Sequence, residues 1–161
     1  MNQNKKNRDD ENNNLNRESI EDLLFHILRM VYQFERVEVA EFDLLYPQIY
    51  ILKFLKRMGN LKVSQIADEM KIPVYAASRL VDQLEKKKYV KRITDKNDKR
   101  ITYASLTSQG DAIVQKLEDH AFELIERGLG SFSIEEIKTI IDSVGKLDKI
   151  LGIEPSQLNK E

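Results

Sequence analysis

Residues 61–107, LKVSQIADEMKIPVYAASRLVDQLEKKKYVKRITDKNDKRITYASLT, decide the fold of this chain. Ser64 is a residue type that caps helices, and we expect it to cap a short helix from Gln65 to Met70. Residues 71–73 form a break, because a proline disfavours helical geometry at the residue before it. A second helix is expected from Val74 to about Lys87, so the segment predicts a helix-turn-helix.

The hydrophobic pattern changes period after this second helix. Residues 89–94 and 101–106 are rich in β-branched and aromatic side chains, and they flank the turn-prone polar segment DKNDK at 95–99. The sequence therefore predicts a β-hairpin, together with a very short strand at 61–63. Helical hairpins alone are common in proteins that never touch DNA. A major-groove helix beside a basic hairpin that reaches the adjacent minor groove is, in contrast, typical of duplex binding.

Amphipathic helices are expected on both sides of this unit. One is predicted from Ser19 to about Val37, and another has Pro47 in its first turn and ends near Gly59. Thr107 is expected to cap a helix from Asp111 to about Arg127, and a capping box at Ser133 opens a last helix to about Leu151. The terminal helices carry more apolar surface than one small domain covers, which indicates a dimer.

The predicted fold class is mainly α with a small β-wing (α+β), a winged helix-turn-helix flanked by N- and C-terminal dimerisation helices. The expected parts are a disordered polar tail (1–16), an N-terminal dimerisation helix (17–42), the winged domain (43–107), C-terminal dimerisation helices (108–152) and a tail (153–161).

Composition narrows the classes of function. The chain has no cysteine, which excludes disulfides and thiolate metal sites. We expect a cytoplasmic protein, because no apolar stretch approaches the length of a membrane span and the polar N-terminus does not resemble a secretory signal. The net charge of -1 hides an asymmetry, since residues 79–103 hold nine basic and four acidic residues and residues 111–161 hold six and eleven. A basic middle segment indicates a polyanionic partner.

Several motifs in this region resemble the MarR family of bacterial winged-helix regulators. They are SQIADEM, the SRLVDQLEKKKYVKR run, the wing tip DKNDKR and the following SLTSQG. The resemblance implies a transcriptional regulator, a repressor, that binds a pseudo-palindromic operator in double-stranded DNA as a homodimer. It also implies release by a small-molecule effector, bound in a pocket between the dimerisation and DNA-binding parts. Two positions depart from the family pattern, because Pro73 replaces a small polar helix cap and Lys88 replaces the usual glycine before the wing.

The candidate DNA-binding residues fall at the cap of the first helix, on the second helix and on the hairpin. Helical spacing separates an outward face from Ala77, Leu80 and Val81, which we expect to be buried. The candidates for contact with bases or phosphates are Ser64, Val74, Tyr75, Ala76, Ser78 and Arg79. The alternative for this face is an ordinary solvated helix surface.

The wing tip supplies the other candidates. Arg100 is expected to enter a narrow minor groove, with Asp98 positioning it, while Lys96 and Lys99 contact phosphates without sequence preference. The alternative is an exposed hairpin ion pair, which contributes little to stability.

Other classes of function find less support in the residues. His26 and His120 are the two histidines, and structural or surface histidines are commoner than metal ligands, so we expect neither a metal nor another cofactor. No Ser/His/Asp set or Gly-rich phosphate loop indicates an enzyme. Aromatic residues at 32, 34, 42, 46 and 50 either line an effector pocket or belong to the core. The alternative function is a winged-helix protein–protein interaction module that does not bind DNA.

Overall fold

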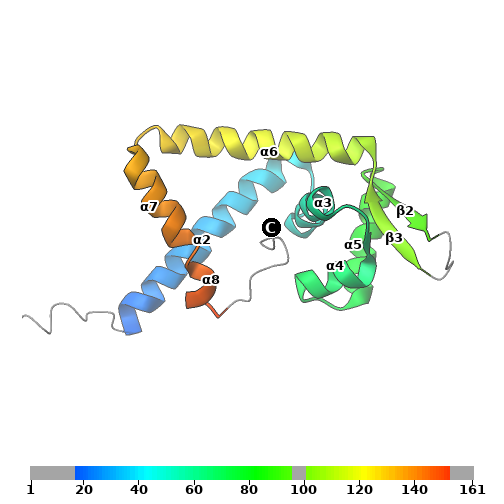
Figure 1. The fold of residues 1–161 in the computed structure, drawn as a ribbon, viewed down its shortest axis with the longest axis horizontal. Coiled ribbons are helices and arrows are strands. Elements are labelled where there is room, and N and C mark those ends of the chain that lie inside the picture. The colour runs from blue at the N-terminus through cyan, green and yellow to red at the C-terminus, as the bar shows by residue number, and fades with distance from the viewer. Residues whose placement is uncertain (1–16, 96–100, 153–161) are drawn as a thin grey trace, which may run out of the picture. The chain divides into compact units, whose positions relative to one another are not determined.

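The computed structural model describes residues 17–95 and 101–152, in two compact units that divide between Asp43 and Leu44. The helices are α2 (Arg17–Phe42), α3 (Tyr46–Met58), α4 (Val63–Met70), α5 (Val74–Lys86), α6 (Ser108–Leu129), α7 (Ile134–Val144) and α8 (Leu147–Ile150). The strands are β1 (Leu61–Lys62), β2 (Val90–Thr94) and β3 (Thr102–Leu106) (Figure 1). The mainly helical fold with a small wing is therefore as predicted. The predicted tails and the wing tip 96–100 lie outside the described residues.

The first unit consists of the long helix α2. It ends at Phe42 rather than near Val37, because the chain has no helix-breaking residue until Asp43 adopts a left-handed φ of 48°. Many of its large apolar side chains are exposed, and Phe25 (68%) and Leu28 (65%) are the most exposed of them. None of the described helices is long and apolar enough to cross a membrane.

The helix-turn-helix lies in the second unit and is formed by α4 and α5. The turn contains Lys71 in a left-handed conformation (φ 54°), and Pro73 occupies the N-cap position of α5. The prediction that Ser64 caps α4 is wrong, because this helix begins at Val63 and Ser64 is its second residue. The side chain of Gln65 satisfies the helix start instead, since its Oε1 accepts a hydrogen bond of 2.9 Å from the backbone N–H of Lys62.

A three-stranded antiparallel sheet with the order β1-β3-β2 forms the wing and its base. The short strand pairs Leu61 with Ala104, which also lies opposite Arg92 of β2. The strand β2 is thus an edge strand, paired along one side only. The hairpin prediction is confirmed to within a residue at each strand.

The core of the second unit lies where α3 packs against α5, α6 and β3. Its fully buried apolar side chains come from α3, α4, α5, β2, β3 and α6, and they include Ile51, Leu52, Ile66, Val81, Leu84, Val90, Ala104, Val114 and Leu117. On α5, Ala77 and Val81 are buried as predicted, whereas Leu80 is only partly covered. The helix-turn-helix and the wing therefore share one hydrophobic core, which holds them as a unit.

The C-terminal helices differ in detail from the prediction. Thr107 caps α6 as expected, although the helix begins immediately, at Ser108, and continues to Leu129. The capping box at Ser133 is confirmed, since its side chain accepts from the backbone N–H of Glu136 and the Glu136 side chain accepts from the N–H of Ser133. The last helix is not continuous to Leu151, because α7 ends at Val144 and Gly145 follows it. Glycine is a poor helix former, which explains the interruption.

Candidate nucleic-acid interface

The first half of α5 presents an exposed face to solvent. Tyr75 is 71% exposed and Val74 is 52% exposed, and Arg79 is exposed one turn further on. Ala76 and Ser78 are partly covered at the edges of this face. The helix therefore shows an aromatic ring, an aliphatic side chain and a guanidinium together, which are groups that can contact base edges and phosphates.

Two contacts fix the helix that carries this face. The backbone carbonyl of Pro73 accepts from the N–H of Ala76 at 2.9 Å and from that of Ala77 at 3.2 Å, so the departure at Pro73 still allows an ordered helix start. At the other end, Gln83 Oε1 accepts a hydrogen bond of 2.8 Å from Nε2 of Gln48, a buried residue of α3. The bond lies in partly buried surroundings and links α5 to α3. It therefore helps to fix the orientation of α5 on the core.

The base of the wing is held by a cluster of hydrogen bonds around Thr107. Its hydroxyl donates to the carbonyl of Lys88 at 2.6 Å and accepts from the N–H of Gly110 at 3.0 Å, while its own N–H donates to the carbonyl of Tyr89 at 3.0 Å. Gly110 must lack a side chain, because a Cβ there would lie 1.9 Å from the Tyr89 carbonyl oxygen. The motif Leu106-Thr107-x-x-Gly110 thus joins the second wing strand to the turn that precedes the first.

Lys88 occupies the turn between α5 and the wing with a φ of 63°. This left-handed region favours glycine, so a lysine there carries conformational strain. The turn nevertheless forms, and the carbonyl of Lys88 is oriented to accept from Thr107. A lysine in place of the usual glycine therefore raises the conformational cost of the turn, while the turn keeps its geometry.

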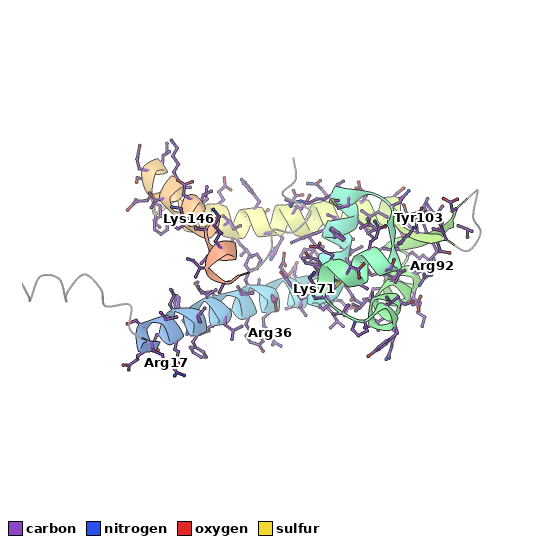
Figure 2. All side chains as sticks on the ribbon, turned by 60° about the horizontal axis from the view of Figure 1, so that its bottom comes forward. Arg17, Arg36, Lys71, Arg92, Tyr103 and Lys146 are labelled. Atoms are coloured by element: carbon purple, nitrogen blue, oxygen red, sulfur yellow. The ribbon has the colours of Figure 1, made fainter. Side chains whose placement is uncertain are left out.

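Arg92 of β2 connects the wing to α5 (Figure 2). Its Nη2 lies 2.5 Å from Asp82 Oδ1 and 3.4 Å from Ser78 Oγ, and its Nε lies 3.4 Å from Glu85 Oε2. The backbone N–H of Arg92 also donates to Glu85 Oε1 at 3.3 Å. Arg92 was not among the residues predicted from the sequence. A signal was available, because two acids three residues apart lie on one face of a helix and an arginine follows in the next strand.

A groove of about 330 Å³ lies between the start of α4, the exposed face of α5 and the wing. Its lining includes Lys62, Ser64, Val74, Ser78, Arg92 and Thr102. Three of the candidates, Ser64, Val74 and Ser78, therefore meet at one surface beside the wing strands. The ammonium of Lys62, which lines the groove, lies 6.0 Å from the ring centroid of Tyr103.

The candidates Lys96, Asp98, Lys99 and Arg100 lie outside the described residues, so their contacts stay a prediction. The described strands fix where the tip begins, because the N–H of Asp95 donates to the carbonyl of Ile101 at 2.9 Å.

Tyr50 is one of the aromatic residues considered for the lining of an effector pocket, and it has a structural role instead. Its ring stacks on Phe54 at 6.3 Å between centroids, and its hydroxyl donates to Glu69 Oε1 at 2.7 Å. Burial, and then the hydrogen bond to Glu69, raise the pKa of Tyr50 to about 12. This residue joins α3 to α4, and it does not line the groove described above. Among the described residues no group of three His, Asp or Glu side chains is placed to hold a metal ion.

A helix-turn-helix whose second helix runs into a β-hairpin defines the winged helix-turn-helix class of DNA-binding domain. The model of the MarR family matches residues 42–101. The chain is 31% identical over 110 residues to the HTH-type transcriptional repressor MdtR of Bacillus subtilis (strain 168), covering 68% of this chain and 71% of that protein. The chain therefore belongs to the MarR family, and it is a helix-turn-helix transcriptional regulator.

Solved structures agree with this assignment of the fold. A MarR family protein from Bacillus stearothermophilus superposes with a TM-score of 0.74 at 24% identity, over 84% of this chain and 94% of that one. FabT of Streptococcus pneumoniae, solved in complex with DNA, superposes with a TM-score of 0.73 at 20% identity, over 85% and 98%. At these identities the likeness establishes the winged fold.

Proposed function

We propose that this regulator is a repressor that binds a pseudo-palindromic operator as a homodimer, with α5 in the major groove and the wing at the adjacent minor groove. The observation that carries the proposal is the shared surface of the exposed α5 face and the groove beside the wing. The same fold in FabT was solved with DNA bound, which supports a nucleic-acid partner. The protein then works in the cytoplasm, where the chromosome is, and as a regulator it has no catalytic role.

The roles of the individual residues follow from their chemistry. Arg79 pairs with a guanine or a phosphate, and Tyr75 and Val74 contact base edges, including thymine methyl groups. Ser64 and Ser78 are placed at the groove to donate hydrogen bonds to phosphate oxygens. At the tip, Arg100 enters the minor groove while Lys96 and Lys99 contact phosphates.

The dimer follows from the apolar surface that one chain leaves exposed. The first unit exposes large apolar side chains on α2, and the second unit exposes others on α6 and α7, which include Phe122, Ile125, Ile134, Ile141 and Val144. Exposed apolar side chains in this number on a helix indicate an interface. A second copy of the chain is the proposed partner, since a symmetric dimer places two recognition helices on one face of a duplex. We also propose, from its membership of the MarR family, that a small-molecule effector releases the protein from the operator.

The test is a selection of duplexes from a randomised pool by the full-length protein. The expected product is a pseudo-palindrome with half-sites about 10 base pairs apart, bound with an affinity that falls steeply as salt rises. Arg79→Ala is expected to weaken binding to this duplex by about 1–3 kcal/mol. The matched control is Lys116→Ala, which removes an exposed positive charge from α6 and should leave the affinity unchanged.

Two outcomes would contradict the proposal. If no duplex is enriched and pull-down from cell extract recovers a protein partner instead, the chain is an interaction module. If light scattering at micromolar concentration gives the mass of one chain, the homodimer is wrong. Equal affinities of Arg79→Ala and Lys116→Ala would remove Arg79 from the interface while leaving the function standing.

A further inference from the structure

The first strand of the wing, β2, packs against α5 through the shared core and lies at an edge of the sheet. In the order β1-β3-β2, the strand β2 is paired along one side only, so its other edge has no strand to hold it. The turn that joins α5 to β2 is short and contains the strained Lys88. Side-chain contacts from β2 to α5 therefore add to the core in setting how the two elements are spaced.

Arg92 makes that contact with three residues on one face of α5. Ser78, Asp82 and Glu85 follow one another at helical spacing, and the guanidinium reaches an oxygen of each. A forked, planar group can bond to several acceptors in a fixed geometry, which a lysine cannot do. The Arg92 side chain is 29% exposed, so its contacts are partly shielded from solvent.

We propose that Arg92 is a positioning residue that fixes the wing to the recognition helix, so that the two elements meet successive grooves of a duplex at a set spacing. This inference rests on the proposed function. In it, Asp82 and Glu85 are the other half of the connection, and their negative charges are directed at Arg92 rather than at the phosphates. The guanidinium itself need not touch DNA.

Charge alone and a positioning role for Arg92 predict opposite effects on DNA affinity when the two carboxylates are removed. Removing two carboxylates from a DNA-binding helix should strengthen binding if charge alone decides affinity. If the carboxylates hold the wing through Arg92, their removal weakens binding to a specific duplex instead. The alternative, in which Arg92 is a phosphate ligand that the acids restrain, predicts tighter binding when the acids are neutralised.

The experiment compares Arg92→Ala, Arg92→Lys, the pair Asp82→Asn with Glu85→Gln, and all three sites changed together, with Lys116→Ala as the control. The probes are a duplex that the wild-type protein selects from a randomised pool and a scrambled duplex of the same base composition. Affinity is measured by fluorescence anisotropy across a salt series, with thermal unfolding recorded for each variant. Because exposed ion pairs contribute little to stability, the unfolding temperatures should stay close to that of the wild type.

The expected result is that Arg92→Ala and the acid pair each weaken the selected duplex between about 3-fold and 100-fold, the range that neighbouring residues show when they are coupled. The combined variant should be no weaker than Arg92→Ala, Arg92→Lys should lie between it and the wild type, and the scrambled duplex should be affected much less. The slope of affinity against salt should not change, since no phosphate contact is lost.

Tighter binding by the acid pair, together with a salt slope reduced by about one in Arg92→Ala, would overturn the inference and make Arg92 a phosphate ligand. Unchanged affinities in both variants would overturn it as well. If the wild-type protein selects no duplex at all, the proposed function fails first, and this inference fails with it.

Discussion

Gly110 offers a sharp test of how the wing is attached to the body of the protein. The added Cβ of Gly110→Ala would lie 1.9 Å from the carbonyl oxygen of Tyr89, 2.9 Å from its carbonyl carbon and 3.1 Å from Cδ2 of Leu106. A carbon and a carbonyl oxygen in contact are normally about 3.3–3.6 Å apart. The Tyr89 backbone must therefore move by more than about 1 Å, and no flexible side chain can take up the difference.

The expected loss of stability is the sum of the interactions that this movement breaks. Overpacking costs about 1–3 kcal/mol, and the two bonds from Thr107 to the Tyr89 carbonyl, at 3.0 Å and 3.3 Å, contribute about 1 kcal/mol each. Alanine gains about 1 kcal/mol over glycine in a helix, which offsets part of the loss. We expect the free energy of unfolding to fall by about 2–4 kcal/mol.

The assay is urea unfolding followed by circular dichroism, at one fixed protein concentration because the stability of a dimer depends on concentration. Gly128→Ala is the control, since Gly128 lies in the same helix with nothing within 4 Å of an added Cβ, and it should gain about 0.5–1 kcal/mol. A loss below about 1 kcal/mol in Gly110→Ala would refute the claim that the close approach to Tyr89 is rigid.

Two further predictions concern the turn before the wing and the contact between α3 and α4. Lys88→Gly should raise the free energy of unfolding by about 1 kcal/mol relative to Lys88→Ala, because both remove the charge and only glycine relieves the φ of 63°; equal stabilities in urea would count against the strain. In a spectrophotometric titration, wild type minus Tyr50→Phe should show a phenol that ionises near pH 12 rather than at the ordinary 10.0. Since the fold raises this pKa by favouring the neutral phenol, the stability contribution is complete below pH 10.0 and is lost as the pH rises toward 12. A difference that titrates near 10 would show that neither burial nor the hydrogen bond to Glu69 favours the neutral phenol.

The local signals in the sequence predicted the elements well because each of them depends on nearby residues. Pro73 and Thr107 mark helix starts through their own backbone and side-chain chemistry, and the change of period at residue 89 marks the hairpin. Ser64 misled the prediction because Gln65 competes for the same helix start with a longer side chain, one residue further from the cap. The end of the first helix was also underestimated, since nothing between residues 37 and 42 is a strong helix breaker.

The contacts between elements could not be predicted in the same way, because they depend on register and packing that no local pattern records. The bond from Gln48 to Gln83 spans 35 residues, and the close approach of Gly110 to Tyr89 requires the wing strands and α6 to be placed together. The two acids on one helix face and the arginine in the next strand are visible in the sequence, but the register that brings Arg92 to Asp82 and Glu85 is not. In the sequence Arg92 adds to the basic count, whereas in the structure it bonds to acids of another element.

This pairing changes what the charge of the DNA-binding segment means. Residues 79–103 hold nine basic and four acidic residues, a net charge of +5. Arg92, Asp82 and Glu85 form one cluster with a net charge of -1, so the rest of the segment carries +6. Half of the acids in the segment therefore hold the two DNA-reading elements together, and their repulsion of phosphates is weakened by the guanidinium between them. A regulator built in this way gains a fixed spacing between helix and wing, and eight of the nine basic residues of the segment remain for the duplex.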